Sequence, residues 1–87
     1  MVQKEILIKL EDGVHARPAA LFVEKANSFK SSIKIVKDNI EVDAKSIMSI
    51  MMLGLTFGTK ITLKVDGEDE SEALETLYKF IDNNFHE

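Results

Sequence analysis

The sequence contains no cysteine and no tryptophan, and it has a single proline among 87 residues. Without cysteine the chain cannot form disulfides, thiolate nucleophiles or cysteine metal sites, and it is compatible with a reducing compartment. No apolar run approaches the roughly 20 residues that a membrane-spanning helix needs. The opening segment MVQKEILIKLEDG carries charges every few residues, unlike a signal peptide. We therefore expect a cytoplasmic protein that does not insert into a membrane.

Basic residues are also scarce, since 11 Lys and Arg stand against 15 Asp and Glu, for a net charge of −4. A nucleic-acid-binding surface carries a basic excess, so direct nucleic-acid binding is not expected. The two histidines, His15 and His86, are far apart in the sequence and show no metal-ligand spacing. We expect no metal site and no cofactor, and we assign no role to His86. The length allows one modest core, so residues 1–87 are expected to form a single domain.

Hydrophobic periodicity divides the chain into seven elements in the order β-α-β-β-α-β-α. Alternating segments at 2–10, 31–37, 40–43 and 60–66 predict strands with one buried face. Helical spacing predicts helices from Ala16 to about Asn27, over 47–53 and within 68–85. Asp38–Asn39 tolerates left-handed backbone and predicts a tight hairpin, with Ile40 and Val42 pointing inward.

These elements lack a Rossmann-type glycine loop, which favours an antiparallel sheet over a doubly wound one. The predicted fold class is α+β: an open-faced β-sandwich whose four-stranded antiparallel sheet is covered on one face by three helices. The stripe of the last helix is expected in the core and consists of Leu74, Leu77, Tyr78, Ile81 and Phe85.

The only arginine and the only proline stand in GVHARPA, residues 13–19, where the first helix is predicted to begin. Amides in a first turn lack intrahelical partners, and the helix dipole adds positive potential, so such a turn attracts phosphate. Gly13 relaxes the turn before the helix, and Pro18 directs the free amides of Ala16 and Arg17. The guanidinium of Arg17 can hold two phosphate oxygens at once.

His15 places a nucleophile in this phosphate-binding turn. A neutral imidazole is nucleophilic without a separate base, and the phosphorus–nitrogen bond that it forms is labile. A helix N-terminus stabilises an anion by only about 0.3–1 kcal/mol, which suits a carrier that releases phosphate better than a hydrolase. Two alternatives remain open: His15 is a helix cap or surface residue, or His15 and Arg17 merely hold an anion in a small-molecule-binding domain.

Two motifs carry a family resemblance. GVHARPA resembles the active-site signature of the histidine-containing phosphocarrier (HPr) family of the bacterial phosphoenolpyruvate:sugar phosphotransferase system. KSIMSIMMLG resembles the second signature of that family, around its regulatory serine. The two motifs have the order and separation found in the family, and the similarity continues through VDGEDESEAL. The resemblance implies the same open-faced β-sandwich that the periodicity predicts.

The resemblance also implies a function. His15 would accept a phosphoryl group from phosphorylated enzyme I and pass it to the A domains of sugar permeases, while Arg17 neutralises the phosphate. Ser46 would be phosphorylated by an ATP-dependent HPr kinase/phosphorylase in hosts that have one, and the modified form would bind a LacI-type catabolite repressor. The protein would be a monomeric transfer intermediate with a phosphohistidine, not a self-contained enzyme. The alternative is a purely regulatory interaction module that acts through Ser46; a paralogue in some bacilli lacks the histidine.

Ser46 also has a structural explanation, because serine is a good N-cap for the helix that follows. Phosphorylation there would add about −1.5 to −2 charges at the positive end of the helix dipole, so we expect it to leave the fold intact. Five of the six residues 47–52 are apolar, more than one narrow stripe can bury. We expect a partner-binding surface beside His15, formed by Ala16, Ala20, Ile47, Met48 and Met51.

Overall fold

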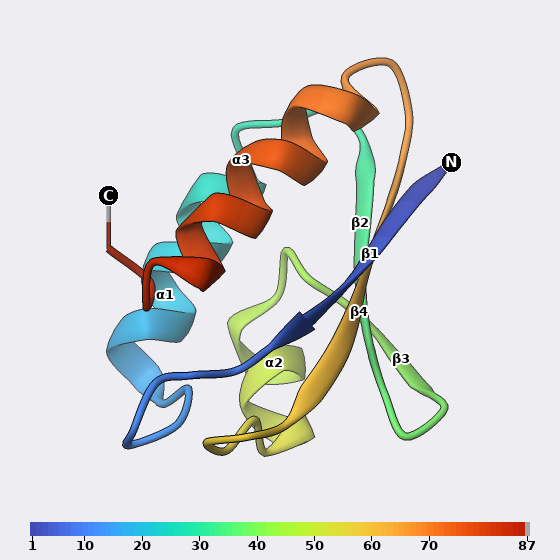
Figure 1. Cartoon of the computed structure of the whole chain (residues 1–87). Coiled ribbons are helices and arrows are strands. Elements are labelled where there is room, and N and C mark those ends of the chain that lie inside the picture. The colour runs from blue at the N-terminus through green and yellow to red at the C-terminus, as the bar shows by residue number, and fades with distance from the viewer. Residues whose placement is uncertain (87) are drawn as a thin grey trace.

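The computed structural model describes residues 1–86, and its elements follow in the predicted order. The strands are β1 (Val2–Leu7), β2 (Ser32–Lys37), β3 (Ile40–Asp43) and β4 (Lys60–Asp66), and the helices are α1 (Ala16–Ala26), α2 (Ile47–Leu53) and α3 (Glu70–Asp82). The strands form one antiparallel sheet in the order β1-β4-β2-β3, and all three helices lie on one side of it (Figure 1). The predicted open-faced β-sandwich is therefore confirmed.

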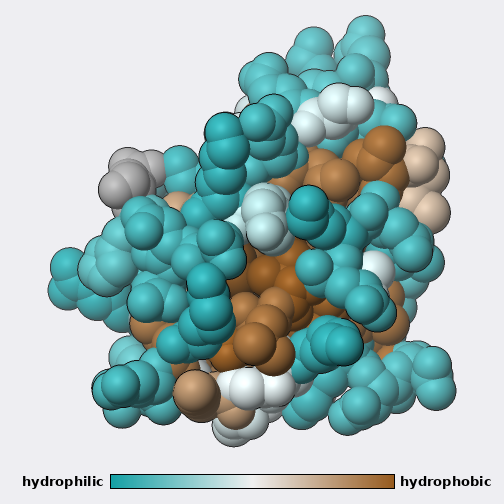
Figure 2. Space-filling view, viewed as in Figure 1, coloured by the Kyte–Doolittle hydropathy of each residue, from teal (hydrophilic) through white to brown (hydrophobic). Residues whose placement is uncertain are grey.

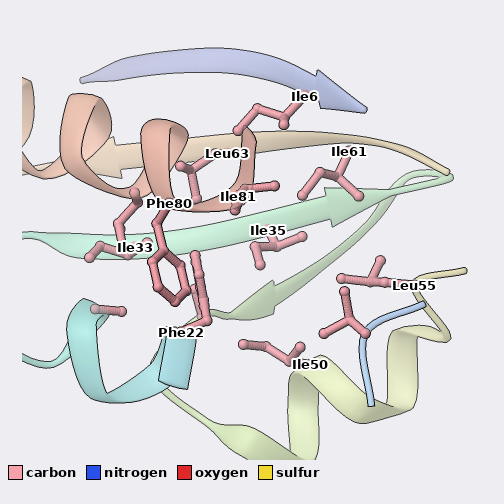
Figure 3. Packing of buried hydrophobic residues seen from close by; sticks show 14 of the residues in the cluster. Ile6, Phe22, Ile33, Ile35, Ile50, Leu55, Ile61, Leu63, Phe80 and Ile81 are labelled. Atoms are coloured by element: carbon pink, nitrogen blue, oxygen red, sulfur yellow. The ribbon is translucent and has the colours of Figure 1, made fainter. Parts of the chain in front are cut away.

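The core lies between the sheet and the helices. Cross-strand pairs such as Ile6 with Ile61 and Ile35 with Leu63 put the apolar residues of each strand on one face, because side chains alternate along a strand. Figure 3 shows these side chains pointing toward the helices, where Phe22 of α1, Ile50 of α2 and Phe80 and Ile81 of α3 meet them. The opposite face is polar and carries a 2.9 Å ion pair from Lys64 Nζ to Glu41 Oε1.

The hairpin between β2 and β3 confirms one prediction and corrects another. Asp38 and Asn39 have φ angles of 50° and 68°, the left-handed backbone that a two-residue hairpin turn needs. Val42 lies opposite Ile35 and is half-buried. Ile40, however, is 58 % exposed, so the prediction that it points into the core is wrong. It pairs with Lys37 in the last rung before the turn, at a sheet corner that the described residues leave uncovered.

The start of α3 is tied to the connection between α1 and β2. The carboxylate of Asp69 accepts hydrogen bonds from the amides of Lys30 (2.9 Å) and Ser31 (3.0 Å) and from the Ser31 hydroxyl (2.5 Å). The Ser31 hydroxyl and the Lys30 amide lower the pKa of Asp69 to about 2. Gly67 has φ 154°, and a Cβ there would lie 2.6 Å from Ser31 Oγ. The close approach therefore requires glycine at this position.

The chain after α3 turns back onto α1. Leu77, Ile81 and Phe85 are buried as predicted, while Leu74 and Tyr78 are half-buried. The helix ends at Asp82, and the amide of Phe85 then donates to Phe80 O at 2.8 Å. Across residues 1–86, none of the helices has the length and apolar character that crossing a membrane requires.

Candidate functional site

The loop before α1 is fixed to the loop before β4. The amide of Gly13 donates to Leu10 O at 2.9 Å, and the amide of Val14 donates to Leu55 O at 2.7 Å. Gly13 has φ 73°, and a Cβ there would lie 2.9 Å from Leu55 O. Any other residue would be strained at this φ and would push the two loops apart. The predicted turn at Gly13 thus sets where α1 begins.

His15 occupies the N-cap position of α1 with an extended backbone (φ −107°, ψ −165°), and its side chain is exposed. Within residues 1–86 its side chain makes no capping hydrogen bond. The first intrahelical bond is donated by Ala19 N to His15 O at 3.0 Å. The amides of Ala16 and Arg17 precede that bond, so they lack a carbonyl acceptor in an earlier turn. Both the imidazole and two amides are therefore available to a ligand.

His15 and Arg17 line one pocket of about 470 Å³. Within residues 1–86, Arg17 forms no ion pair, whereas Lys9 in the same pocket is held by Asp82, at 2.8 Å between Lys9 Nζ and Asp82 Oδ1. The pocket lies between the loop at 9–12, the first turns of α1 and the C-terminal turn; the remaining lining residues are Leu10, Glu11, Asp12, Pro18, Leu21, Asn84, Phe85 and His86. The imidazole of His15 and the guanidinium of Arg17, which has no ion-pair partner among residues 1–86, thus border the same pocket, an arrangement that suits an anion.

Of the lining residues, the sequence analysis assigned only His15, Arg17 and Pro18 to this site; Leu21 and His86 are among those that it missed. Leu21 is 43 % exposed and stands one helical turn after Arg17. The i, i+4 spacing was a usable signal, because such residues share a helix face. His86 comes from the opposite end of the chain, and nothing in its sequence neighbourhood connects it with His15. Only the tertiary fold brings the two histidines to one pocket.

Ser46 begins α2 as predicted. Its Oγ accepts a hydrogen bond from the amide of Ser49 at 3.3 Å, and its carbonyl accepts from Ile50 N at 3.2 Å. The helix ends at Gly54, whose φ of 65° is left-handed. The N-cap prediction for Ser46 is confirmed, and its side chain is half-buried at the surface.

The five residues of the predicted partner-binding surface all face outward. Met48 is 71 % exposed, while Ile47 and Met51 are 41 % and 40 % exposed, and Ile50 between them is buried. Ala16 and Ala20 are exposed on α1, which packs against α2. In Figure 2 hydrophobic side chains reach the surface in the region of α2 among hydrophilic ones. Their part in binding remains a prediction.

Comparison with known families adds to this geometry. The family model described as "PTS HPr component phosphorylation site" matches residues 2–83, which include both His15 and Ser46. The chain belongs to the HPr family. The HPr-like protein Crh of Halalkalibacterium halodurans is 52% identical over 82 residues, 94% of this chain and 98% of that protein. The phosphocarrier protein HPr of Treponema pallidum is 44% identical over 87 residues, 100% of this chain and 99% of that one.

Solved HPr structures agree with the fold and bear on the oligomeric state. HPr from Thermoanaerobacter tengcongensis superposes with a TM-score of 0.95 at 48% identity, over 100% of this chain and 98% of that one. An HPr dimer from the same organism gives a TM-score of 0.78 at 48% identity, over 97% of this chain and 99% of that one. Crh of Bacillus subtilis, at 46% identity, also forms a dimer, described as swapped. The expectation of a monomer is therefore not supported by these neighbours.

Proposed function

We propose that this protein is a cytoplasmic phosphocarrier of sugar uptake, in which His15 accepts a phosphoryl group from phosphorylated enzyme I and passes it to the A domains of sugar permeases. The observation that carries the proposal is the exposed imidazole of His15 at the opening of α1, in one pocket with Arg17. A lone pair of a neutral ring nitrogen attacks phosphorus and forms the phosphorus–nitrogen bond. The bond from phosphorus to the donor breaks, and its electron pair stays with the donor. Onward transfer repeats this exchange with His15 as the leaving group.

The surroundings of His15 stabilise the phosphoryl group only moderately. The amides of Ala16 and Arg17 and the guanidinium of Arg17 offer hydrogen bonds to its oxygens. A helix terminus contributes about 0.3–1 kcal/mol, and each ~1.4 kcal/mol changes an equilibrium tenfold. Such a site holds a phosphohistidine without trapping it, as a carrier between two partners requires.

Phosphoryl labelling tests the proposal directly. Incubation with labelled phosphoenolpyruvate and catalytic enzyme I is expected to give an acid-labile label on the wild-type protein. The label should be lost in His15→Ala and retained in the matched control Ser46→Ala. No label on the wild type, or an undiminished label on His15→Ala, would refute the carrier function. Stabilisation by anions without any label would select the anion-binding alternative.

A regulatory function is the second candidate, because the Crh proteins of H. halodurans and B. subtilis are 52% and 49% identical to this chain, above the 44% of the T. pallidum HPr. In this case an HPr kinase/phosphorylase transfers phosphate from ATP to Ser46, and the modified surface binds a LacI-type repressor in carbon catabolite repression. The expected label is acid-stable, depends on ATP and is lost in Ser46→Ala. An acid-stable label without any acid-labile one would mean that regulation is the sole function.

The exposed residues Ala16, Ala20, Ile47, Met48 and Met51 are proposed to contact enzyme I and the A domains. Flexible methionine suits a surface that binds several partners. Met48→Asp should weaken transfer from enzyme I and to an A domain about tenfold, since it places a charge in an apolar contact. Met52→Asp is the matched control, because Met52 is 81 % exposed but borders a different pocket, beside Ile40. Equal transfer rates for Met48→Asp and the wild type would exclude this surface.

A further inference from the structure

The pocket of His15 contains the second histidine of the chain, and the proposed carrier function does not use it. His86 lines the same pocket of about 470 Å³ as His15 and Arg17, from the C-terminal side. In Figure 1 the end of α3 comes down beside α1, which is how the last turn reaches this pocket. Within residues 1–86 no hydrogen bond or ion pair involves the His86 side chain, so its ring is available to a ligand.

His86 is held in place by the residue before it. Phe85 is 5% exposed, and its ring makes edge contacts with Phe22 of α1 (6.2 Å between centroids) and with Phe80 (5.6 Å). The amide of His86 donates to Asn83 O at 3.2 Å, and Asn83 Nδ2 donates to His86 O at 3.2 Å. The backbone of His86 is therefore anchored against the helix that carries His15. Its side chain is exposed and borders the His15 pocket as well as two neighbouring pockets along α1 and α3.

The charged groups around the pocket offer few hydrogen-bond donors to a phosphoryl group on His15. A phosphoryl group brings about two negative charges and three acceptor oxygens. Glu11 and Asp12 on the loop side add carboxylates, and Lys9 is already paired with Asp82. Arg17 is thus the one cation of the pocket that is always charged and has no ion-pair partner within residues 1–86. An imidazole donates a hydrogen bond through a ring N–H whether neutral or protonated, so His86 can serve as a donor in either state.

We propose that His86 is a second phosphate-binding residue of this carrier: its ring N–H donates a hydrogen bond to an oxygen of the phosphoryl group on His15. The inference rests on the proposed carrier function and extends it to the C-terminal turn. Guanidinium and amides hold the phosphoryl group from the α1 side, and the imidazole of His86 holds it from the α3 side. The bond stabilises the phosphorylated form and makes no contribution to the free protein.

A phosphoryl competition measures this stabilisation apart from any effect on folding or docking. Equal amounts of wild type and a variant are mixed with limiting phosphoenolpyruvate and catalytic enzyme I, which equilibrates the phosphoryl group between them. Intact mass then gives the ratio of the two phosphorylated proteins. The wild type should hold about tenfold more phosphoryl group than His86→Ala, as expected for one hydrogen bond to a charged acceptor. His86→Gln, which keeps a donor, should come within about twofold of the wild type.

Lys9→Ala provides the matched control for charge, and its mass is resolved from that of the wild type. It removes a formal positive charge from the same pocket, but one that Asp82 already neutralises, so its ratio to the wild type should stay within about twofold. A ratio near one for His86→Ala, or equal losses for His86→Ala and His86→Gln, would overturn the role of His86. The absence of phosphorylation in the wild type would instead refute the carrier function on which the inference rests.

Discussion

The starts of α1 and α2 differ in how their free amides are used. At α2 the Oγ of Ser46 accepts a hydrogen bond from Ser49 N at 3.3 Å, so the helix caps itself. At α1 the side chain of His15 makes no capping bond within residues 1–86, although the helix is longer, with 11 residues against 7. An uncapped start costs about 1 kcal/mol of stability. The comparison shows that α1 lacks a stabilising cap at the place where a ligand can supply the missing hydrogen-bond acceptor. In contrast, α2 is capped by its own serine.

The largest expected effect comes from replacing His15 by a residue that caps α1 but cannot accept a phosphoryl group. His15→Asn should abolish acid-labile phosphorylation, by about a thousandfold or more, because the nucleophile is gone. The same variant should raise the free energy of unfolding by about 1 kcal/mol, because asparagine is a favourable N-cap. Labelling and urea unfolding measure the two effects. A loss of stability in His15→Asn would show that the imidazole stabilises the fold, and it would contradict the view that α1 begins without a stabilising side chain.

The loop before α1 should be the next most sensitive place. Gly13→Ala should lower the free energy of unfolding by about 2–4 kcal/mol, through left-handed backbone strain and overpacking against Leu55 O. Gly58→Ala is the matched control, since Gly58 has φ 85° but a Cβ there meets nothing within 4 Å in the described structure. That control should cost only about 1 kcal/mol. Equal losses in urea unfolding would mean that the contact with Leu55 does not position the loop.

The cap of α2 should have a smaller effect. Ser46→Ala should lower the free energy of unfolding by about 1 kcal/mol, because the amide of Ser49 loses its acceptor. Ser46→Asp keeps an acceptor, so its stability should remain close to that of the wild type. Serine-phosphorylated protein should likewise retain its circular dichroism spectrum and melting temperature. A large loss of helix in the phosphorylated form would contradict the view that this modification acts through the surface.

The smallest effect is expected at the start of α3, where the carboxylate of Asp69 accepts hydrogen bonds from Lys30 and Ser31 instead of capping the helix. Hydrogen bonds from Ser31 and Lys30 lower the pKa of Asp69 to about 2 in the folded protein. A lowered folded pKa stabilises the fold above the ordinary pKa of the carboxyl group. That stabilisation is lost as the pH falls from about 4 toward 2. Melting temperatures of Asp69→Asn should fall less over this range than those of the wild type; parallel curves would contradict the assignment.

Local patterns in the sequence were enough to predict most of the fold. Alternation placed Ile61, Leu63 and Val65 on the buried face, and Asp38–Asn39 predicted the hairpin. The same alternation failed at Ile40, because periodicity gives the face of a residue but not whether a helix covers it. The strand order β1-β4-β2-β3 depends on pairings between distant segments, which local periodicity does not specify.

The site was predictable where it is contiguous in sequence. GVHARPA predicted His15 and Arg17 at the start of a helix, and the structure places both in one pocket. His86 could not be predicted, because its place depends on the turn after α3. There Asn84 and Phe85 adopt left-handed φ angles of 56° and 61°, which phenylalanine rarely does and which no sequence pattern signalled.

In the described sheet, strand β1 pairs only with β4, which lies at residues 60–66. The β2–β3 hairpin can close as soon as it is synthesised, but β1 must wait until most of the chain has left the ribosome. Pairings between distant segments form slowly, so we expect β1 to dock last in folding. Substitutions in β1 would then speed unfolding and leave the folding rate nearly unchanged.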